Sequence, residues 1–233
     1  MPLPGLVCDQ TVWQQQLAAL SGVAQCICMD WGTLDSLTSM AEKVLREAPE
    51  RFSLAGHSMG GRVAMEVYRL APRRVRRIAL LDTGWAPLPE GVRGEEEARN
   101  RNALLAIAQS QGMRAMAEKW LPPMIAASRW NDAPLVEAIL QMFARKTAGI
   151  FAAQIRALLA RSDARSVLRE IRCPALVLTG EQDSWSPPRN HEEMAAAIAG
   201  SQLVLVPGSG HMSTMEQPAA VTQAMGVWLE RAK

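Results

Sequence analysis

The sequence predicts an α/β fold of three layers, with helices on both faces of a mostly parallel sheet of about six strands. Short, unbroken apolar runs alternate with helical patterns through residues 1–85 and again through residues 171–233. Parallel strands that are buried on both faces are expected to have this continuous apolar character. Residues 86–170 interrupt the alternation and contain helical patterns without a convincing buried strand. We therefore expect a helical cap inserted into an α/β core.

The core regions contain all of the expected strands. Most of the apolar runs end in a turn and are followed by a segment of helical spacing, which is the pattern of parallel βαβ units. The expected strands are residues 3–9 (a stub that runs into a loop), 23–29, 52–55, 75–81, 173–179 and 202–206. The expected core helices are residues 11–20, 37–45 (capped by Asp35 or Ser36), 62–70, 189–198 and 218–231.

The inserted region begins with a linker rich in proline and glycine at residues 86–94. Several methionines and tryptophans recur in it at helical spacing, which most often indicates a helix core. A helical insertion also has a second apolar surface to cover, against the sheet, so some of these side chains can line a pocket. The expected cap helices are residues 95–111, 113–120, 133–147 and 149–160.

One strand-to-helix turn carries the pattern Gly-x-Ser-x-Gly, at Gly56, Ser58 and Gly60. An apolar strand precedes it and a helical segment follows, which is the context of a nucleophile elbow. The glycines let the strand and helix backbones approach closely, and the strained turn lifts the Ser58 hydroxyl clear of the sheet. The N-terminus of the helix directs free N–H groups at a reacting carbonyl. The alternative is a glycine-rich turn whose serine has no chemical role.

A serine hydroxyl needs a base within hydrogen-bond distance, and the base needs an anion to orient it. Of the three histidines, His57 adjoins Ser58 on a tight turn and should point away from it. His191 begins a helix and has no partner nearby in the sequence. His211 follows the last strand in a glycine-flanked loop, where open parallel sheets bind ligands. We therefore expect His211 to be the base.

Aspartates at strand ends are the candidates for the anion. Asp30 and Asp82 compete with Asp183, and Asp82 is the stronger rival because its strand follows the elbow strand in the chain. The order Ser58, Asp183, His211 is the serine–acid–histidine order of one hydrolase fold, which favours Asp183. Asp82 stays open as the alternative.

An oxyanion that forms on the substrate needs two backbone donors. The N–H of Met59, directly after the nucleophile, is one candidate. The loop after the first strand should supply the other, and there Gly5 allows close approach while Leu6 offers its N–H. A simple Pro-Gly turn would have the same sequence.

Composition excludes several classes of protein. The 25 basic and 23 acidic residues give a net charge of +2, too small and too scattered for a nucleic-acid surface. No apolar run reaches membrane-spanning length and no secretory signal is apparent, so we expect a cytoplasmic protein. The four cysteines form no metal-ligand pattern and are expected to be buried in a reducing compartment, with Cys8 structural or pocket-lining rather than reactive.

These motifs together resemble the α/β-hydrolase family. The matching pieces are Gly56-His57-Ser58-Met59-Gly60-Gly61, Gly180-Glu181-Gln182-Asp183 and Gly210-His211, with a helical cap after the strand at 75–81. The likeness covers essentially the whole chain and is strongest to small carboxylesterase-like members. It implies a Ser58–His211–Asp183 triad, an acyl-enzyme intermediate, and neither cofactor nor metal. The family has two further strands before the oxyanion loop, so we expect a truncated N-terminal edge of the sheet.

The expected function is hydrolysis of a carboxylic ester with an apolar acyl or alkyl group, a small-molecule substrate. The pocket is expected to run between sheet and cap, past Trp85, Trp120, Trp185 and Met212. The same triad can cleave a lactone, an enol-lactone, a thioester or a carbon–carbon bond beside a ketone, because the cap pocket decides between substrates. A binding protein on the same scaffold is the remaining alternative, and the sequence says nothing of oligomeric state.

Overall fold

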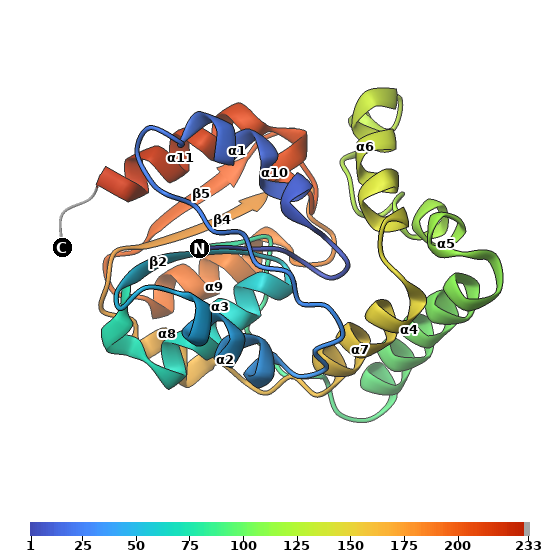
Figure 1. Cartoon of the computed structure of the whole chain (residues 1–233), viewed down its shortest axis with the longest axis horizontal. Coiled ribbons are helices and arrows are strands. Elements are labelled where there is room, and N and C mark those ends of the chain that lie inside the picture. The colour runs from blue at the N-terminus through green and yellow to red at the C-terminus, as the bar shows by residue number, and fades with distance from the viewer. Residues whose placement is uncertain (231–233) are drawn as a thin grey trace.

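A five-stranded parallel sheet forms the centre of the computed structural model, which describes residues 1–230 (Figure 1). Neighbouring strands follow one another in the chain, so each pair is joined by a crossover and is parallel. The carboxyl ends of the strands therefore lie along one edge of the sheet. The strands are β1 (Pro2–Leu3), β2 (Phe52–His57), β3 (Val75–Leu81), β4 (Ala175–Gly180) and β5 (Gln202–Val206).

Helices cover both faces of the sheet and make the three layers that the sequence predicts (Figure 1). On one face α11 contacts α1, β4 and β5; on the other, α3 contacts β2 and β3 while α9 contacts β4 and β5. The predicted helix at 11–20 is a 3-10 turn followed by α1, and Arg231 of the predicted last helix lies outside the described residues. The core helices are α1 (Gln14–Ala19), α2 (Leu37–Glu47), α3 (Met59–Leu70), α8 (Arg165–Glu170), α9 (Pro188–Ala197), α10 (Ser213–Glu216) and α11 (Pro218–Glu230).

Local chemistry explains how α2 forms. Ser36 is its N-cap and accepts a hydrogen bond from the Ser39 N–H, which leaves Ser36 rather than Asp35 in the capping position. Met40 and Ala41 lie one helical turn before Val44, and all three are fully buried. The helix therefore packs this apolar face against α3, which it contacts along its length.

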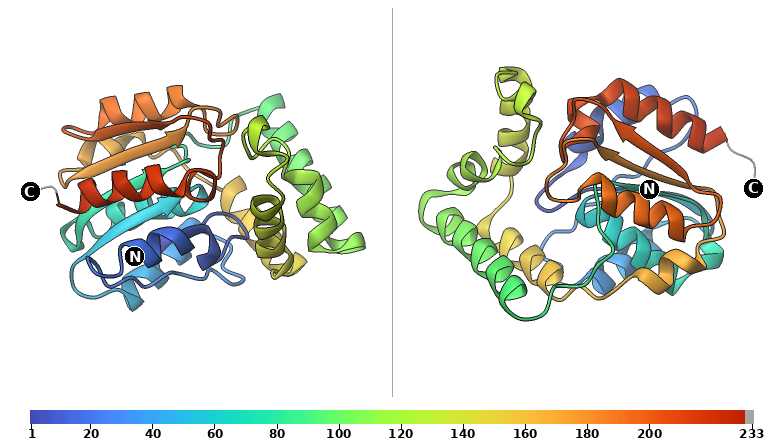
Figure 2. Two further views of the ribbon diagram at one scale, coloured as in Figure 1. Left: turned by 90° about the horizontal axis from the view of Figure 1, so that it is seen from above. Right: turned by 180° about the vertical axis from the view of Figure 1, so that it is seen from behind.

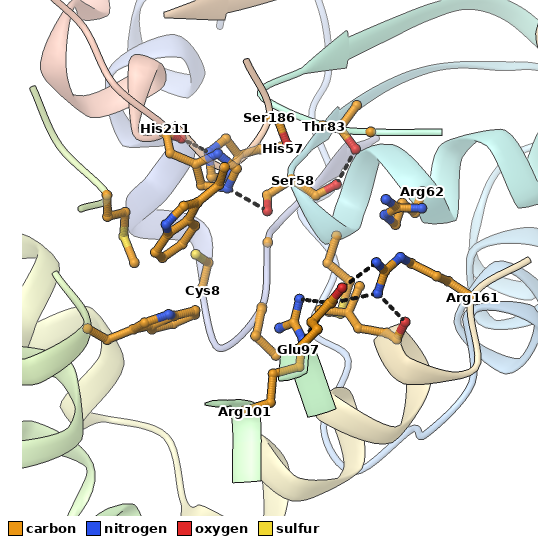
Figure 3. A pocket seen from close by; sticks show the side chains of 18 of the residues that line it. Cys8, His57, Ser58, Arg62, Thr83, Glu97, Arg101, Arg161, Ser186 and His211 are labelled. Atoms are coloured by element: carbon orange, nitrogen blue, oxygen red, sulfur yellow. Dashed lines mark hydrogen bonds and ion pairs between the residues drawn. The ribbon is translucent and has the colours of Figure 1, made fainter. Parts of the chain in front are cut away.

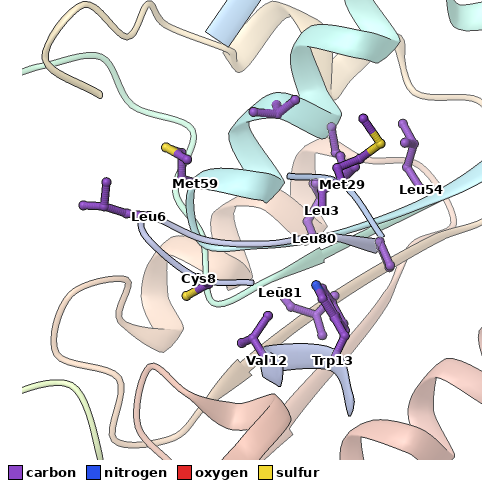
Figure 4. Packing of buried hydrophobic residues seen from close by; sticks show 14 of the residues in the cluster. Leu3, Leu6, Cys8, Val12, Trp13, Met29, Leu54, Met59, Leu80 and Leu81 are labelled. Atoms are coloured by element: carbon purple, nitrogen blue, oxygen red, sulfur yellow. The ribbon is translucent and has the colours of Figure 1, made fainter. Parts of the chain in front are cut away.

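The hydrophobic core extends from the sheet into the loop that follows β1 (Figure 4). Leu54 and Leu80, on the two central strands, are fully buried, as are Leu3 and Trp13. Leu6 and Cys8 of the loop are also buried. Because its side chains share the core with the central strands, this loop is held in one position over the end of the sheet.

The prediction of a strand at residues 23–29 is wrong. This segment runs beside β1, but β1 is only two residues long and Met29 N–H donates the hydrogen bond that joins the two, to Pro2 O. Val23 and Ile27 are 64% and 42% exposed, and Cys26, expected in the core, is exposed. The apolar run thus covers the sheet's edge instead of extending it, and the sheet has five strands rather than about six.

Four helices of the inserted region form a lobe beside the carboxyl ends of the strands (Figures 1 and 2). They contact one another through the pairs α4–α5, α5–α6 and α4–α7. Within residues 1–230, none of the helices has the length and apolar character that crossing a bilayer requires. The lobe helices are α4 (Val92–Gln111), α5 (Met113–Trp120), α6 (Ala133–Ala144) and α7 (Ala148–Leu159).

We predict that Gly60→Ala destabilises the fold by more than about 2 kcal/mol, because the new Cβ would lie 2.0 Å from the Leu3 backbone oxygen, where no flexible side chain can yield. Gly22→Ala is the matched control, since its Cβ would meet no atom within 4 Å. Urea denaturation of both variants measures the difference. Equal midpoints for the two variants would contradict the close crossing of β1 over α3.

Candidate active site

The turn between β2 and α3 has the strained geometry of a nucleophile elbow. Ser58 has φ 53° and ψ −117°, a conformation that L-residues rarely adopt. Its N–H donates to Leu81 O at 2.9 Å, and its carbonyl accepts from the Thr83 hydroxyl at 2.7 Å. A Cβ on Gly56 would lie 2.3 Å from Gly60 O, so this close approach of strand and helix requires the glycine. Neighbouring β3 thus holds the turn in place.

Ser58, His211 and Asp183 form one continuous network of hydrogen bonds, of which Figure 3 shows the bond between Ser58 and His211. The Ser58 hydroxyl and His211 Nε2 are 2.8 Å apart, and His211 Nδ1 and Asp183 Oδ2 are 2.8 Å apart. The other carboxylate oxygen of Asp183 accepts from the N–H groups of Trp185 and Ser186, both at 2.9 Å. This network assigns the proton to Nδ1 of His211 and leaves Nε2 free to accept the serine proton.

Charge and burial have opposite effects on the pKa values of Asp183 and His211. Burial favours neutral forms, but the mutual attraction of the Asp183 carboxylate and the His211 imidazolium outweighs it. The pKa of His211 is consequently raised above its ordinary value of 6.5, and the pKa of Asp183 is lowered. Asp183 is therefore a carboxylate at neutral pH, as an anion that orients the imidazole must be.

Asp82 takes a different position from the one a rival acid would need. It is fully buried beside the Ser58–His211–Asp183 network. There its Oδ1 accepts from Gly180 N–H and its Oδ2 accepts from the Ser213 hydroxyl. The imidazole that Asp82 contacts is that of His57, with 3.6 Å between Asp82 Oδ2 and His57 Nε2. Burial raises the pKa of Asp82, and the nearby Asp183 raises it further. Its hydrogen bonds join β4 to the α10 region.

The other two histidines act as buried hydrogen-bonding groups. His57 Nε2–H donates to the His211 carbonyl at 2.8 Å, so it supports the backbone of that residue. His191 Nε2 accepts from Thr83 N–H at 3.0 Å, a partner that the sequence did not reveal. Burial lowers the pKa of both side chains, to about 3 for His57 and about 4 for His191, which keeps both neutral.

The loop after β1 presents its backbone to the serine. Cys8 N–H bonds to Gly5 O at 3.2 Å and closes a tight turn, in which Val7 has φ 51°. Gly5 lies so close to the elbow that a Cβ would be 3.2 Å from Ser58 Cβ. Among the described residues, the N–H groups of Leu6 and Met59 have no hydrogen-bond partner. Both donors are thus available beside the serine.

Gln154, on α7, holds this turn from the lobe and is a residue that sequence reasoning missed. Its Oε1 accepts from Val7 N–H at 2.7 Å and its Nε2 donates to Gly32 O at 3.3 Å. A positive φ is costly for a branched residue such as Val7, so a buried hydrogen bond at that amide stabilises a strained turn. The sequence offered one indication of this role, a lone glutamine among the apolar residues of the 150–159 segment.

Glu216, on α10, is a second missed residue and holds the loop of His211. Its buried carboxylate accepts from the N–H groups of Gly210 and Met212 on either side of the histidine, and from Ala126 N–H. His211 N–H itself donates to Met124 O at 2.7 Å. The histidine loop is therefore fastened both to the core and to the segment between α5 and α6.

A cavity of about 560 Å³ opens in front of the serine and lies between sheet and lobe. That volume suits a small-molecule ligand. Trp120 and Trp185 stack on each other at 5.2 Å between ring centroids, and Trp185 lies 5.0 Å from the His211 ring. The predicted lining residues Trp120, Trp185 and Met212 face this cavity. The predicted oxyanion donors Leu6 and Met59 also line it, as does Cys8, whose thiol pKa is raised by burial.

Trp85 is a correction to the predicted pocket. It lies in a separate hollow with Arg165, whose guanidinium is 4.4 Å from the centroid of the indole ring. The backbone explains the difference: Trp85 O accepts from Ala164 N–H, so the linker after β3 runs along the start of α8 and carries the indole away from the serine. Trp130, in the lobe, is exposed.

The charged side of the cavity is a further feature that sequence reasoning missed. Four arginines and two glutamates line it (Arg62, Arg93, Arg101, Arg161, Glu96 and Glu97). They come from α3, α4 and the segment directly after α7, three parts of the chain that are distant in sequence. Only the arrangement of lobe and core shows that they face one space, and Figure 3 labels four of them (Arg62, Glu97, Arg101 and Arg161).

Comparison with known proteins gives the family. The pattern that describes the alpha/beta hydrolase family matches residues 3–224 of the chain. The chain belongs to the alpha/beta hydrolase family. The match includes the elbow, both of the loops that carry Asp183 and His211, and the inserted lobe.

Individual relatives of this hydrolase support a hydrolytic activity on the scaffold. A pimeloyl-[acyl-carrier protein] methyl ester esterase of Nitrosomonas europaea is 27% identical over 203 residues, which cover 79% of this chain and 74% of the relative. A putative carbamate hydrolase of Azorhizobium caulinodans is 29% identical, with 88% and 81% covered. A thermophilic esterase from Thermogutta terrifontis, described with malate bound, superposes with a TM-score of 0.85 at 28% identity, with 98% and 88% covered.

We predict that turnover falls as pH drops through a midpoint above 6.5. His211 must be neutral to accept the serine proton, and its pKa is raised because Asp183 opposes the effect of burial. A profile of kcat/KM against pH measures the midpoint in the free enzyme. Asp183→Asn should move the midpoint down. A wild-type midpoint at or below 6.5 would contradict the stabilisation of the His211 imidazolium by Asp183.

Removal of the Gln154 side chain should loosen the loop of Leu6. We predict that Gln154→Ala lowers kcat about tenfold and changes KM little, because a displaced oxyanion donor weakens transition-state binding more than substrate binding. Gln141→Ala is the control, since that glutamine is exposed and, among the described residues, its side chain bonds only to Glu137 on the same helix. Steady-state kinetics on one ester compare the two variants. Equal kcat for both variants would exclude a role of Gln154 in positioning the loop of Leu6.

Proposed function

We propose that the protein is a serine hydrolase that cleaves a carboxylic ester, with an apolar acyl or alkyl group, through an acyl-enzyme intermediate. The observation that carries the proposal is the unbroken hydrogen-bond chain from Ser58 through His211 to Asp183. A hydroxyl in a strained turn, a neutral imidazole aimed at it and a buried carboxylate behind the imidazole together form a nucleophile that acts at neutral pH. The esterases among the relatives support the ester as substrate.

In the first half-reaction Ser58 Oγ attacks the ester carbonyl while His211 Nε2 accepts the hydroxyl proton. The charge that develops on the carbonyl oxygen is stabilised by the N–H groups of Met59 and Leu6. Met59 N–H lies at the N-terminus of α3, where the helix dipole adds to the same stabilisation. His211 then donates its proton to the leaving alkoxide, and the ester bond breaks.

In the second half-reaction His211 accepts a proton from water, which attacks the acyl-serine. Collapse of the second tetrahedral intermediate releases the carboxylic acid and returns the proton to Ser58. Asp183 stabilises the imidazolium that forms in each half and keeps Nδ1 as the donor. No cofactor or metal takes part in these steps.

The cavity favours a substrate with an apolar part. Trp120, Trp185 and Met124 form one side of it, next to His211, where the leaving group or the acyl chain would lie.

We propose that residues 86–170 act as a cap on a hydrolase core formed by residues 1–85 and 171–233. Met124 O and Ala126 N–H bond to the loop and helix that support His211, so the cap also stiffens the catalytic loop.

A fluorophosphonate probe tests the proposal. Wild type should be labelled covalently at one site and should hydrolyse 4-nitrophenyl butyrate, and Ser58→Ala should lose both properties while it keeps its melting temperature. A panel of lactones, enol-lactones, thioesters and diketones with a cleavable carbon–carbon bond, tested beside the esters, distinguishes the other bonds that this triad can cleave. Labelling that persists in Ser58→Ala would overturn the proposal.

The two buried aspartates provide a matched pair for the acid. We predict that Asp183→Asn lowers kcat by about 10³-fold or more, since the imidazole loses its orienting anion. Asp82→Asn should cost far less, because Asp82 bonds to Gly180 and Ser213 and not to His211. Turnover of the same ester by the two variants gives the ranking, and the reverse order would assign the acid to Asp82.

A further inference from the structure

The side of the cavity opposite His211 carries an excess of positive charge (Figure 3). Arg161 donates to both carboxylate oxygens of Glu97 at 2.7 Å, and Arg101 donates to Oε1 of the same carboxylate at 2.8 and 2.9 Å. Arg62 donates to Ala86 O at 2.9 Å and has no acidic partner among the described residues. Two of the three arginines therefore share one carboxylate, and the third has no acidic partner among the described residues. Glu96 and Arg93, also on this side, are exposed and of opposite charge.

Such an excess is costly unless a ligand compensates for it. The Arg161 and Glu97 side chains are only 9% and 25% exposed, so water screens the cluster incompletely. Burial and the nearby Arg161 lower the pKa of Arg62 to about 9, which still leaves it charged at neutral pH. An anion that enters the cavity would be attracted by all three guanidinium groups at once. The cluster is thus incomplete without a negative charge from outside.

The position of Arg62 fixes where that anion would lie relative to the reacting bond. Ser58 is the N-cap of α3 and Arg62 lies in the first turn of that helix, four residues further on, a rise of about 6 Å along the axis. Both face the same cavity. An ester whose carbonyl carbon lies at Ser58 Oγ therefore brings an anionic group near Arg62 if only a few bonds separate that group from the carbonyl.

We propose that Arg62, Arg101 and Arg161 form a carboxylate-binding subsite, and that the substrate is a monoester of a dicarboxylic acid. This inference rests on the proposed ester hydrolysis at Ser58. A planar carboxylate matches the paired donors of a guanidinium, and Arg62 has donors left for it. Attack at the ester carbonyl breaks the acyl–oxygen bond, the alcohol leaves, and water then releases the dicarboxylic acid with one proton lost to solution.

Matched ethyl esters test the subsite in the full chain. One series carries a terminal carboxylate (monoethyl glutarate, adipate and pimelate) and the other carries a terminal carboxamide of the same length and shape. Proton release in a pH-stat gives kcat/KM for each. Wild type should prefer the carboxylate by about tenfold or more at one chain length, because a charge-assisted hydrogen bond replaces a neutral one.

The variants then assign the preference to the cluster. Arg62→Gln should reduce the ratio of carboxylate to carboxamide kcat/KM to about one, and Arg62→Lys should retain part of it. Arg69→Gln is the control, because Arg69 lies on the same helix but is exposed and paired with Glu66. It should leave the ratio and the activity unchanged.

The same measurements distinguish failure of the subsite from failure of the proposed ester hydrolysis. If wild type hydrolyses the carboxamide esters but shows no preference for any carboxylate, the subsite is excluded while the proposed function stands. If an ester with a terminal phosphonate is preferred over the carboxylate by about tenfold, the subsite takes a phosphate-like group and the carboxylate assignment is wrong. If no ester in either series is hydrolysed and the fluorophosphonate does not label Ser58, the proposed function itself fails.

Discussion

The hydrogen bond between His211 and Ser58 joins residues 153 positions apart in the chain, and the rest of the structure serves to make it possible. It can form only because β2, β4 and β5 run parallel and end at the same edge of the sheet. Ser58 is placed there by a strained turn that β3 supports, and His211 by a loop whose amides bond to Glu216. Asp183 completes the chain from the end of β4.

Much of this arrangement was predictable, because local signals specify it. The Gly-x-Ser-x-Gly turn, the apolar runs at 52–55, 75–81 and 202–206, and the glycine beside His211 are each readable within a few residues. The order of serine, acid and histidine selected Asp183 over Asp82, and the structure brings Asp183, not Asp82, to His211. Family membership follows from the same stretches of sequence.

What could not be predicted depends on contacts between distant segments. The run at 23–29 has the composition of a strand, but β1 offers it too short a partner, so it stays an irregular edge segment. Trp85 was expected in the pocket because it follows β3, whereas the linker turns along α8 and takes it elsewhere. Gln154 and Glu216 bond to backbone amides over 147 and 90 residues, which no local pattern encodes.

The cavity unites two chemical environments on either side of one nucleophile. Stacked tryptophans adjoin His211 on one side. On the other side lie three arginines, of which two share a single glutamate. The scaffold and its triad account for hydrolysis in general, while this asymmetry is specific to the lobe and to Arg62. In the proposed function, selection of the substrate therefore depends on residues other than those that break the bond.

The most direct measurement of the central claim is the location of the covalent intermediate. The enzyme is mixed with 4-nitrophenyl acetate, quenched in acid within one turnover and digested, and the peptides are analysed by mass spectrometry. We predict an acetyl group on Ser58 that disappears at the rate of the second half-reaction. An acetyl group on another side chain, such as Cys8, or continued turnover without any adduct, would contradict it.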